Sequence, residues 1–448
     1  MGMKVSKPIL AFAIVSLACI CTISSAAQDS SSQRGKTVRH HRVAQEENQF
    51  SPELAAAEAA LDKKDYAEAQ TLLQNLTAKH PDNYRAWFDL GYAYTATKQR
   101  QQAIEAYRRS VEANPQVFES NLNLGIVLGE SNSTEAEKYL RAATQLKPTA
   151  NVDEGHYRAW LSLAKVLRGS KPEEAINAFL EAVRLAPKDA EPHLGAGEVL
   201  EKQNNLPEAE KEYQAAAKLA PHSTEPLAAL INLYSREKKL PEAEAALRQY
   251  LGLEPKNGVA HIQLGRVLAA EGKADEAASE LRAGLELAPN DPSGQRELAD
   301  LSLAANKYSE AEHQYRALLE KQPDDADLHH SLGMVLMKER EFPQAEQQFL
   351  QAVKLKPDFG EAYGDLAFAA NENKNYAGVL KALEFRAKYL PETPATYFLR
   401  ATAYDHLREY KQASENYRQF LQAAAGKFPD QEWQAKHRLI AIDPKSKK

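Results

Sequence analysis

Apolar residues recur along most of the chain at spacings of three and four residues, and short polar segments separate the recurrences. The stretch 84–115 shows the pattern, because two groups of its residues each fit one face of an α-helix. The first group is Trp87, Leu90, Gly91 and Tyr94, and the second is Ala103, Tyr107 and Ser110. This stretch therefore predicts two amphipathic helices in succession.

The same pattern returns at an interval that proline marks. A proline closes each copy, at Pro81, Pro115, Pro148, Pro187, Pro221, Pro255, Pro289, Pro323, Pro357 and Pro391. From Pro187 to Pro391 every interval is 34 residues. Proline has no amide hydrogen and disfavours helical backbone in the residue before it. It therefore predicts the end of the second helix and a turn into the next copy.

Small residues recur at two places in the copies, where large side chains would hold two helices apart. Glycine occupies the first place at Gly91, Gly125, Gly197, Gly265 and Gly333. Alanine occupies the second at Ala103, Ala136, Ala175, Ala209, Ala243, Ala277, Ala311 and Ala345. An aromatic residue or leucine follows each alanine within four residues and is expected to fill the remaining gap. Each copy is thus predicted to be a closely packed antiparallel helical hairpin.

These residues and their interval resemble the tetratricopeptide repeat. The resemblance implies an all-α fold, a right-handed superhelical solenoid of about eleven helical hairpins with a C-terminal capping helix. Hairpins of this kind bury their apolar faces only against neighbours, and they enclose a groove lined by first helices. We expect the array over residues 50–428, with units starting near residues 50, 84, 118, 157, 190, 224, 258, 292, 326, 360 and 394.

Three segments depart from the regular unit. Thr149–His156 is expected to lengthen the fourth connection, and Gly129–Glu137 shortens the third unit by one residue, so we expect a local kink there. Residues 429–448 are expected to form the capping helix and a loose tail. In that helix the side chains available to cover the last unit are Trp433, Leu439 and Ile442.

Residues 1–27 have the order of a secretory signal peptide. Lys4 and Lys7 precede the apolar run 9–23, and small residues then lead to cleavage after Ala26 or Ala27. One alternative is an uncleaved membrane anchor, although the run is shorter than the ~20 residues that span a bilayer. We therefore expect an exported protein, periplasmic or extracellular in a bacterial-type cell.

A second alternative is lipid attachment at Cys19, because "SLAC" resembles a bacterial lipobox with Ser16 where leucine is usual. Cys19 and Cys21 are the only cysteines of the chain, so cleavage would leave no thiol. Residues 28–49 are polar and read as a disordered linker. His40 and His41 within it are expected to be solvated rather than metal ligands.

The composition and motifs favour binding over catalysis. The net charge of −6 and the absence of a basic stripe speak against a nucleic-acid partner. No glycine-rich phosphate loop, HExxH, GxSxG or CxxC occurs, so we expect no enzyme activity and no cofactor. His329 and His330 are adjacent and point to different faces, which does not suit a helical zinc site. We expect no metal, and we expect His330 to face the groove.

The ninth residues of successive units should lie side by side along the groove. They run from apolar through charged to apolar: Tyr92, Ile126, Lys165, Glu198, Asn232, Arg266, Asp300, Met334 and Phe368. Two apolar ends are candidate partner-binding sites, namely Phe88, Tyr92 and Ile126 at one end and Met334, Met337, Phe368 and Phe398 at the other. The alternative is that these side chains only pack between helices. Lys165–Glu198 and Arg266–Asp300 are expected to be ion pairs between units.

Family members that bind chaperones hold a peptide carboxylate with lysine and asparagine on first helices. The lysine places carry Phe88, Leu122, Leu161, Leu194 and Ala228, and only Asn232 matches an asparagine place. The prediction is therefore an exported scaffold or adaptor that binds a protein or peptide partner by other contacts. The alternative is an assembly lipoprotein of the cell envelope that is acylated at Cys19 and serves a pilus, polysaccharide or outer-membrane machinery.

Overall fold

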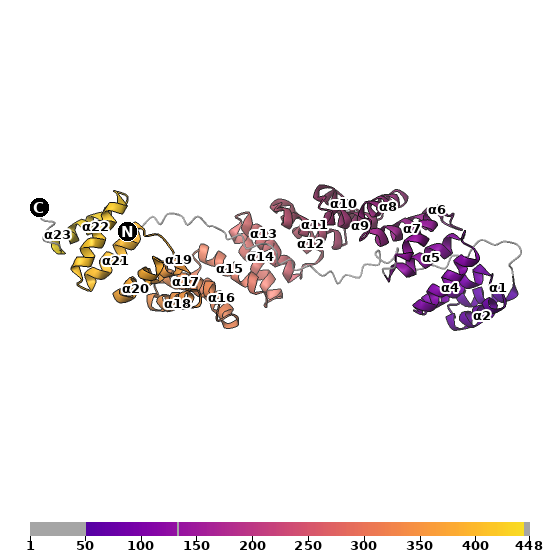
Figure 1. Ribbon diagram of the computed structural model, residues 1–448, viewed down its shortest axis with the longest axis horizontal. Helices are drawn as coiled ribbons and strands as arrows, with labels where there is room; N and C mark the ends of the chain where they lie inside the picture. Colours follow the sequence, from indigo (N-terminus) through magenta and orange to yellow (C-terminus); the bar gives the residue numbers. More distant parts are fainter. Residues whose placement is uncertain (1–50, 132–133, 443–448) are drawn as a thin grey trace. The chain divides into compact units, whose positions relative to one another are not determined.

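The computed structural model describes residues 51–131 and 134–442, and within them every regular element is an α-helix (Figure 1). The predictions for the signal peptide, Cys19, the linker with its histidines, and the last six residues lie outside this part. The chain divides after Pro255 into two compact units. The prediction of an all-α array of helical hairpins followed by a C-terminal helix is confirmed.

The first unit contains six helical hairpins. Its helices are α1 Pro52–Asp62, α2 Tyr66–Lys79, α3 Tyr84–Ala96, α4 Arg100–Ala113, α5 Phe118–Gly129, α6 Glu135–Gln145, α7 Val152–Leu167, α8 Pro172–Leu185, α9 Glu191–Lys202, α10 Leu206–Leu219, α11 Glu225–Glu237 and α12 Leu240–Leu253. Consecutive helices contact each other throughout this series, within hairpins and between them.

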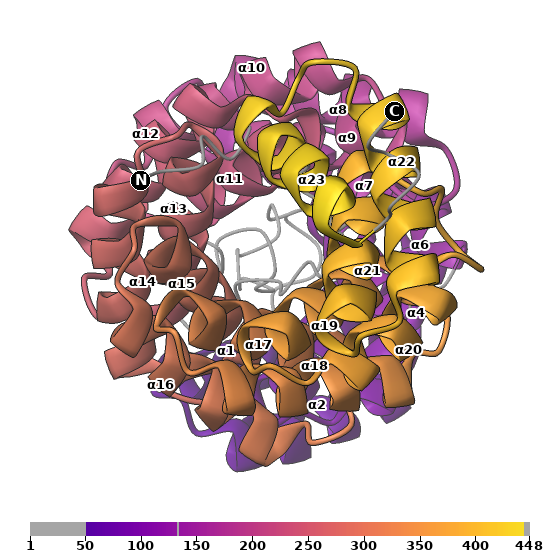
Figure 2. The same cartoon turned by 90° about the vertical axis from the view of Figure 1, so that its left-hand side faces the viewer.

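The second unit contains five hairpins and a final single helix. Its helices are α13 Gly258–Ala270, α14 Ala274–Leu287, α15 Pro292–Ala304, α16 Tyr308–Lys321, α17 Ala326–Lys338, α18 Phe342–Leu355, α19 Gly360–Glu372, α20 Tyr376–Arg386, α21 Pro394–His406, α22 Tyr410–Ala424 and α23 Pro429–Ile442. The final helix α23 lies against α22 at the C-terminal end of this unit (Figure 2).

Glycine allows the two helices of a hairpin to approach closely. A Cβ atom added to Gly91 would lie 2.7 Å from ring carbons of Tyr107, and one added to Gly333 would lie 2.7 Å from Phe349. The equivalent glycines Gly125, Gly197 and Gly265 meet Leu140, Tyr213 and Leu281 in the same way. The eight alanines at the second small place are all fully buried. The predicted packing of small residues against a large side chain is confirmed.

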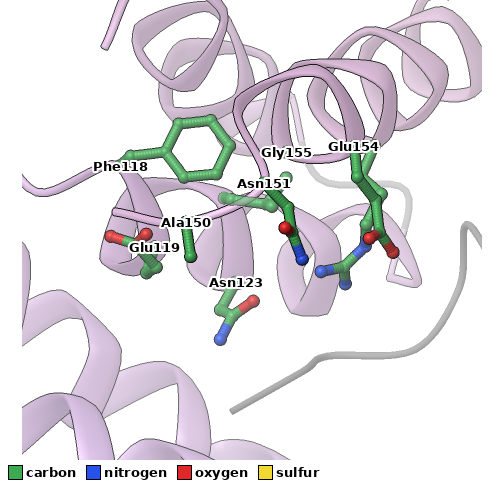
Figure 3. A pocket seen from close by; sticks show the side chains of 9 residues that line it. Phe118, Glu119, Asn123, Ala150, Asn151, Glu154 and Gly155 are labelled. Carbon is green, nitrogen blue, oxygen red and sulfur yellow. The ribbon is translucent and has the colours of Figure 1, made fainter. Parts of the chain in front are cut away.

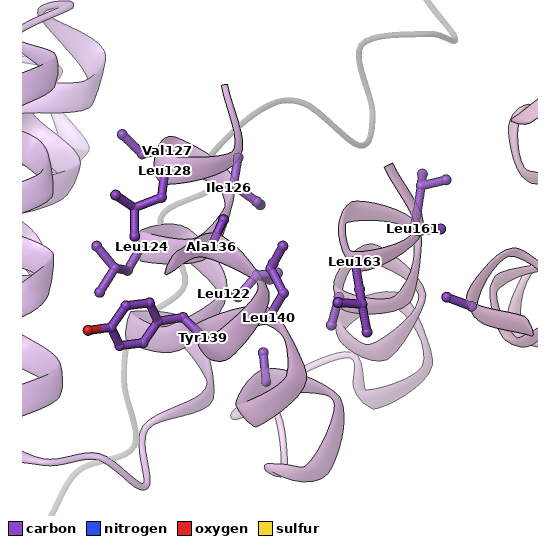
Figure 4. Close-up of a cluster of buried hydrophobic side chains, with 14 of the residues drawn as sticks. Leu122, Leu124, Ile126, Val127, Leu128, Ala136, Tyr139, Leu140, Leu161 and Leu163 are labelled. Atoms are coloured by element: carbon purple, nitrogen blue, oxygen red, sulfur yellow. The ribbon is translucent and has the colours of Figure 1, made fainter. Parts of the chain in front are cut away.

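The apolar core runs between consecutive hairpins. In the first unit one cluster joins Leu122 and Leu124 of α5, Leu140 of α6, and Leu161 and Leu163 of α7 (Figure 4). All five side chains are at most 2% exposed. Burial at roughly 25 cal/mol per Å² of apolar surface makes this continuous core the main source of stability. No hairpin has a complete core of its own, so the stability of each hairpin depends on its contacts with its neighbours.

Hydrogen bonds join the start of a hairpin to the proline that closes the preceding one. Trp87 Nε1 donates to the carbonyl oxygen of Pro81 at 2.9 Å. The fourth residue of other first helices makes the same contact, in the pairs Asn121–Pro115, Gln295–Pro289 and His329–Pro323, each at 3.0 Å. A carbonyl beyond a helix end lacks a helical partner, and these side chains supply a hydrogen bond. The sequence pattern predicted Trp87 only as a packing residue.

The turn inside most hairpins contains one residue with left-handed backbone. Its φ lies between 57° and 67° at Lys64, Lys98, Asn204, Lys238, Asn306, Arg340, Lys374 and Arg408. Glycine takes this role once, at Gly272 with φ 82°. Left-handed backbone crowds a Cβ atom and costs roughly 1–2 kcal/mol, so most of these turns carry a small strain. The turn reverses the chain within two or three residues.

The structure changes two expectations about irregular segments. Part of the segment Thr149–His156 lengthens the connection, but residues from Val152 onward extend the front of α7 instead. In α23, Leu439 is buried as predicted, whereas the side chain of Trp433 is 62% exposed and does not cover the last unit. The covering contact comes from Ala435, which is fully buried. Trp433 lies on the other side of the helix, beside His437.

Candidate functional site

The predicted site residues of the first unit lie mostly in its core. Phe88 is fully buried, and its ring centroid is 5.8 Å from that of Tyr107. Ile126 is 6% exposed. Tyr92 is half-buried against Tyr66, and this burial raises the pKa of its phenol. Contact of these residues with a partner stays a prediction, and the buried Phe88 and Ile126 offer little surface for it.

A small polar hollow lies between α5 and α7 of the first unit (Figure 3). Glu119 is buried there, and its carboxylate accepts the backbone N–H of Thr149 at 2.8 Å. Asn123 and Arg158 are also buried in its wall. The contact to Thr149 holds the irregular connection in place, so a structural role accounts for Glu119. Sequence reasoning missed this cluster, because a charged residue near the start of a helix usually lies in solvent.

In the second unit the structure places the predicted residues on neighbouring first helices. Helix α19 contacts both α17 and α21. Met334 and Met337 of α17 are half-buried against the core of this unit. Phe368 of α19 is 48% exposed. We call the surface formed by Met334, Met337, Phe368 and Phe398 the α17–α19–α21 face.

Phe398 links this face to an open hollow at the end of the array. Its ring packs 5.0 Å from that of Phe420 and 6.1 Å from that of Tyr417. Residues of α21 and α23 line the hollow, among them Thr402 and the exposed Trp433. The exposed indole therefore stands at the edge of a hollow that already contains a predicted site residue.

Hydrogen bonds hold two carboxylates on first helices of the second unit, one of them on α19 of the α17–α19–α21 face. Asp365 of α19 accepts a hydrogen bond from His330 of α17, with 2.8 Å between its oxygen and Nε2. The imidazole of His330 lies between Phe349 and Phe359, at ring distances of 5.5 and 4.8 Å. Asp300 of α15 accepts a hydrogen bond from the hydroxyl of Tyr315. Only Asp365 shares a helix with a residue of the face, since it lies on α19 three residues before Phe368.

The two predicted ion pairs have different partners in the structure. Lys165 Nζ binds Glu191 at 2.5 Å, and Glu198 is instead 3.7 Å from a guanidinium nitrogen of Arg168. Arg266 binds Glu297 at 2.8 Å rather than Asp300. These pairs connect neighbouring first helices, so ion pairing between hairpins is present with shifted partners. Partial burial between the helices raises the pKa of the Glu297 carboxyl in spite of Arg266.

Neither adjacent histidine belongs to a group of metal ligands. His329 contacts Gln348 and the Pro323 carbonyl, and His330 contacts Asp365. In residues 51–131 and 134–442, no three side chains of histidine, cysteine, aspartate or glutamate gather in a way that could hold a metal ion. None of the helices in these ranges has the length and apolar composition needed to cross a bilayer.

Family models with the description "Tetratricopeptide repeat" match the chain along most of its length. One model matches residues 54–118, 99–151, 166–224, 296–358 and 330–378. Two more with the same description match residues 234–301 and 394–426. The stretches matched by the first model alone cover more than half of the 448 residues.

Two similar relatives share only a short stretch with the chain. Protein O-mannosyl-transferase TMTC3 of Homo sapiens is 24% identical over 160 residues, which are 33% of this chain and 18% of that protein. Peroxisome biogenesis protein 5 of Arabidopsis thaliana is 30% identical over 140 residues, which are 29% of this chain and 17% of that protein. The chain thus matches less than a fifth of the length of either relative.

Solved structures that resemble the chain include YrrB, described as a TPR protein with an unusual peptide-binding site. The similarity covers 42% of this chain and 96% of YrrB, with 24% identity and a TM-score of 0.38. Pseudomonas aeruginosa PilF is 19% identical over 47% of this chain and 97% of its own, also with a TM-score of 0.38.

Proposed function

Because the chain belongs to the tetratricopeptide repeat family, we propose that it is a scaffold or adaptor that binds a protein or peptide partner on the first helices of its hairpins. Its role would be to hold a partner rather than to transform a substrate. The α17–α19–α21 face is the surface that we assign to this role.

The exposed ring of Phe368 carries this proposal. Phe368 lies in the middle of a first helix, and 48% of it remains exposed. The half-buried thioethers of Met334 and Met337 lie on the adjacent first helix. Methionine adapts its shape easily, and aromatic and methionine residues are enriched in protein interfaces. Together they offer an adaptable apolar surface.

Substitution of Phe368 by aspartate tests the proposal. We expect Phe368→Asp to leave the melting temperature nearly unchanged and to reduce crosslinking capture of the native partner by about tenfold or more, as for an interface anchor. Leu350→Asp is the matched control, because Leu350 is 53% exposed on the second helix α18. Equal capture by both variants would refute a binding role for this face.

We propose, on the sequence of residues 1–27, that the protein is exported and that cleavage near Gln28 releases it. The alternative, lipid attachment at Cys19, would keep it at a membrane in an envelope assembly. N-terminal sequencing and intact mass of the exported chain separate the two. A mature chain that begins at Met1 would exclude cleavage, and a mass increase with an N-terminal cysteine would establish the lipoprotein.

A further inference from the structure

We propose that the α17–α19–α21 face binds a partner segment that carries both large apolar and basic side chains. This inference rests on the proposed function and specifies the chemistry of the partner. It follows from the charges that accompany the apolar surface, from the exposure of the residues involved, and from a contact that the chain makes with its own C-terminal helix.

The first helices around this face carry an excess of negative charge. The carboxylates of α15, α17, α19 and α21 are Glu297, Asp300, Asp327, Glu361, Asp365, Glu372 and Asp405. The lysines and arginines of the same helices are Arg296, Lys338 and Arg400. The four helices thus carry seven carboxylates and three cations, whereas the whole chain of 448 residues has a net charge of −6. An acidic partner would be repelled here and a basic one attracted.

Two of the three cations already have partners. Arg296 lies 3.7 Å from Asp325, and Arg400 lies 2.6 Å from Glu392. Both partner carboxylates precede the helices concerned and are therefore additional to the seven. Cations outside the four helices pair with three of the seven carboxylates, in the pairs Arg266–Glu297, Lys356–Asp327 and Arg438–Asp405. The excess of negative charge is therefore concentrated on α19, which carries Glu361, Asp365 and Glu372 and no lysine or arginine.

On α19 the carboxylates lie within two turns of the exposed apolar ring. Asp365 precedes Phe368 by three residues and Glu361 precedes it by seven, so all three lie toward one side of the helix. The side chain of Asp365 is 39% exposed, and Glu361 is exposed. A partner that covers Phe368 with an apolar side chain would therefore bring its neighbouring residues against both carboxylates.

The chain itself shows how an apolar and basic segment can bind at the end of this surface. Arg438 of α23 directs its guanidinium to Asp405 of α21, with 2.8 Å between Nη2 and Oδ1. The next residue, Leu439, is buried against the last hairpin. A helix with arginine beside leucine thus already contacts one carboxylate and the adjoining apolar core. The same combination fits the carboxylates of α19 and the ring of Phe368.

Three synthetic peptides of equal length test the inference by fluorescence anisotropy with the full chain. One combines leucine with lysine, one leucine with glutamate, and one serine with lysine. We expect the leucine–lysine peptide to bind at least about tenfold more tightly than either of the others. Equal or tighter binding of the leucine–glutamate peptide would overturn the inference and leave the proposed function standing.

Charge neutralisation on α19 locates the binding site. Glu361→Gln combined with Asp365→Asn should weaken the leucine–lysine peptide by about two- to fivefold per charge. The control combines Glu320→Gln with Glu384→Gln, which removes two exposed carboxylates from second helices of the same unit. If both double variants weaken binding equally, the attraction comes from overall charge and the inference fails.

Glu361→Gln alone keeps the test valid if the double variant does not fold, because Glu361 is exposed. Phe368→Asp separates the inference from the function on which it rests. Failure of all three peptides to bind, together with unchanged partner capture by Phe368→Asp, would refute the proposed function itself. Loss of partner capture without a preference for the basic peptide would refute only the inference.

Discussion

The contact between Gly91 and Tyr107 allows a direct test of why five of the hairpins have glycine at this place. In Gly91→Ala the new Cβ atom would lie 2.7 Å from two ring carbons of Tyr107 and 2.9 Å from a third. Tyr107 is fully buried and packs against Phe88, so its ring cannot move away freely. We expect this overlap to destabilise the hairpin by about 1–3 kcal/mol.

A second term opposes the overlap, because alanine is favoured over glycine in a helix by roughly 1 kcal/mol. Gly252 of α12 provides the control, since it is also helical but has no atom within 4 Å of an added Cβ. We therefore expect Gly252→Ala to be neutral or stabilising and Gly91→Ala to be less stable than Gly252→Ala by the overlap energy. Subtracting the stability change of one variant from that of the other cancels the gain in helix propensity that both substitutions share.

Hydrogen exchange of the amides of α3 and α4 is the suitable assay, because repeat arrays can open locally. Faster exchange in this hairpin of Gly91→Ala, with little change in the second unit, is the expected result. Exchange that is equal to or slower than that of the unsubstituted protein would show that the ring of Tyr107 moves aside without destabilising the hairpin. The packing argument for all five glycines would then be refuted.

Three further predictions concern single contacts. Trp87→Phe keeps an aromatic side chain, although a smaller one, and loses the hydrogen bond to Pro81. It should lower the free energy of unfolding in urea denaturation by about 0.5–1.5 kcal/mol, and an unchanged value would show that the bond does not contribute to stability. Burial raises the pKa of Glu297 above its ordinary value of 4.5, and the stabilisation that results is fully present when the pH is below that value. This stabilisation is lost as the pH rises through the raised pKa of the folded protein. Thermal unfolding should therefore show Glu297→Gln gaining stability relative to the unsubstituted protein between pH 4 and 7, and a constant difference would contradict the argument. Arg438→Gln removes the bond to Asp405 and should speed amide exchange in α23 about fivefold, for a loss of about 1 kcal/mol, and unchanged exchange would show that apolar packing alone holds this helix.

The sequence predicts the hairpins well because their determinants are local and periodic. The small residue at Gly91 and the ring at Tyr107 lie 16 residues apart, and the equivalent pairs that begin at Gly197, Gly265 and Gly333 keep this separation. The hydrogen bond from Trp87 to Pro81 was not predicted, since it depends on the direction of a carbonyl beyond the helix end. Tryptophan, asparagine, glutamine and histidine all meet this requirement, so their shared role is hidden in the sequence.

Side-chain reach and depth were less predictable than helix positions. Lys165 binds Glu191, which lies two turns of helix before Glu198, because a long side chain selects its partner by the relative height of two helices. Phe88 is buried and Phe368 is exposed although both were placed on the groove side. Their depth depends on the neighbouring helices, and a periodic pattern carries no information about that distance.

The left-handed turn residues also divide the chain at regular intervals. Lysine or arginine occupies this position in six hairpins, at Lys64, Lys98, Lys238, Arg340, Lys374 and Arg408, and each of these residues is exposed. Trypsin cleaves after lysine and arginine, and exposed turns are the usual sites of first cleavage. In the second unit the last three of these sites are 34 residues apart. Brief digestion would therefore release fragments that differ in mass by one helical hairpin.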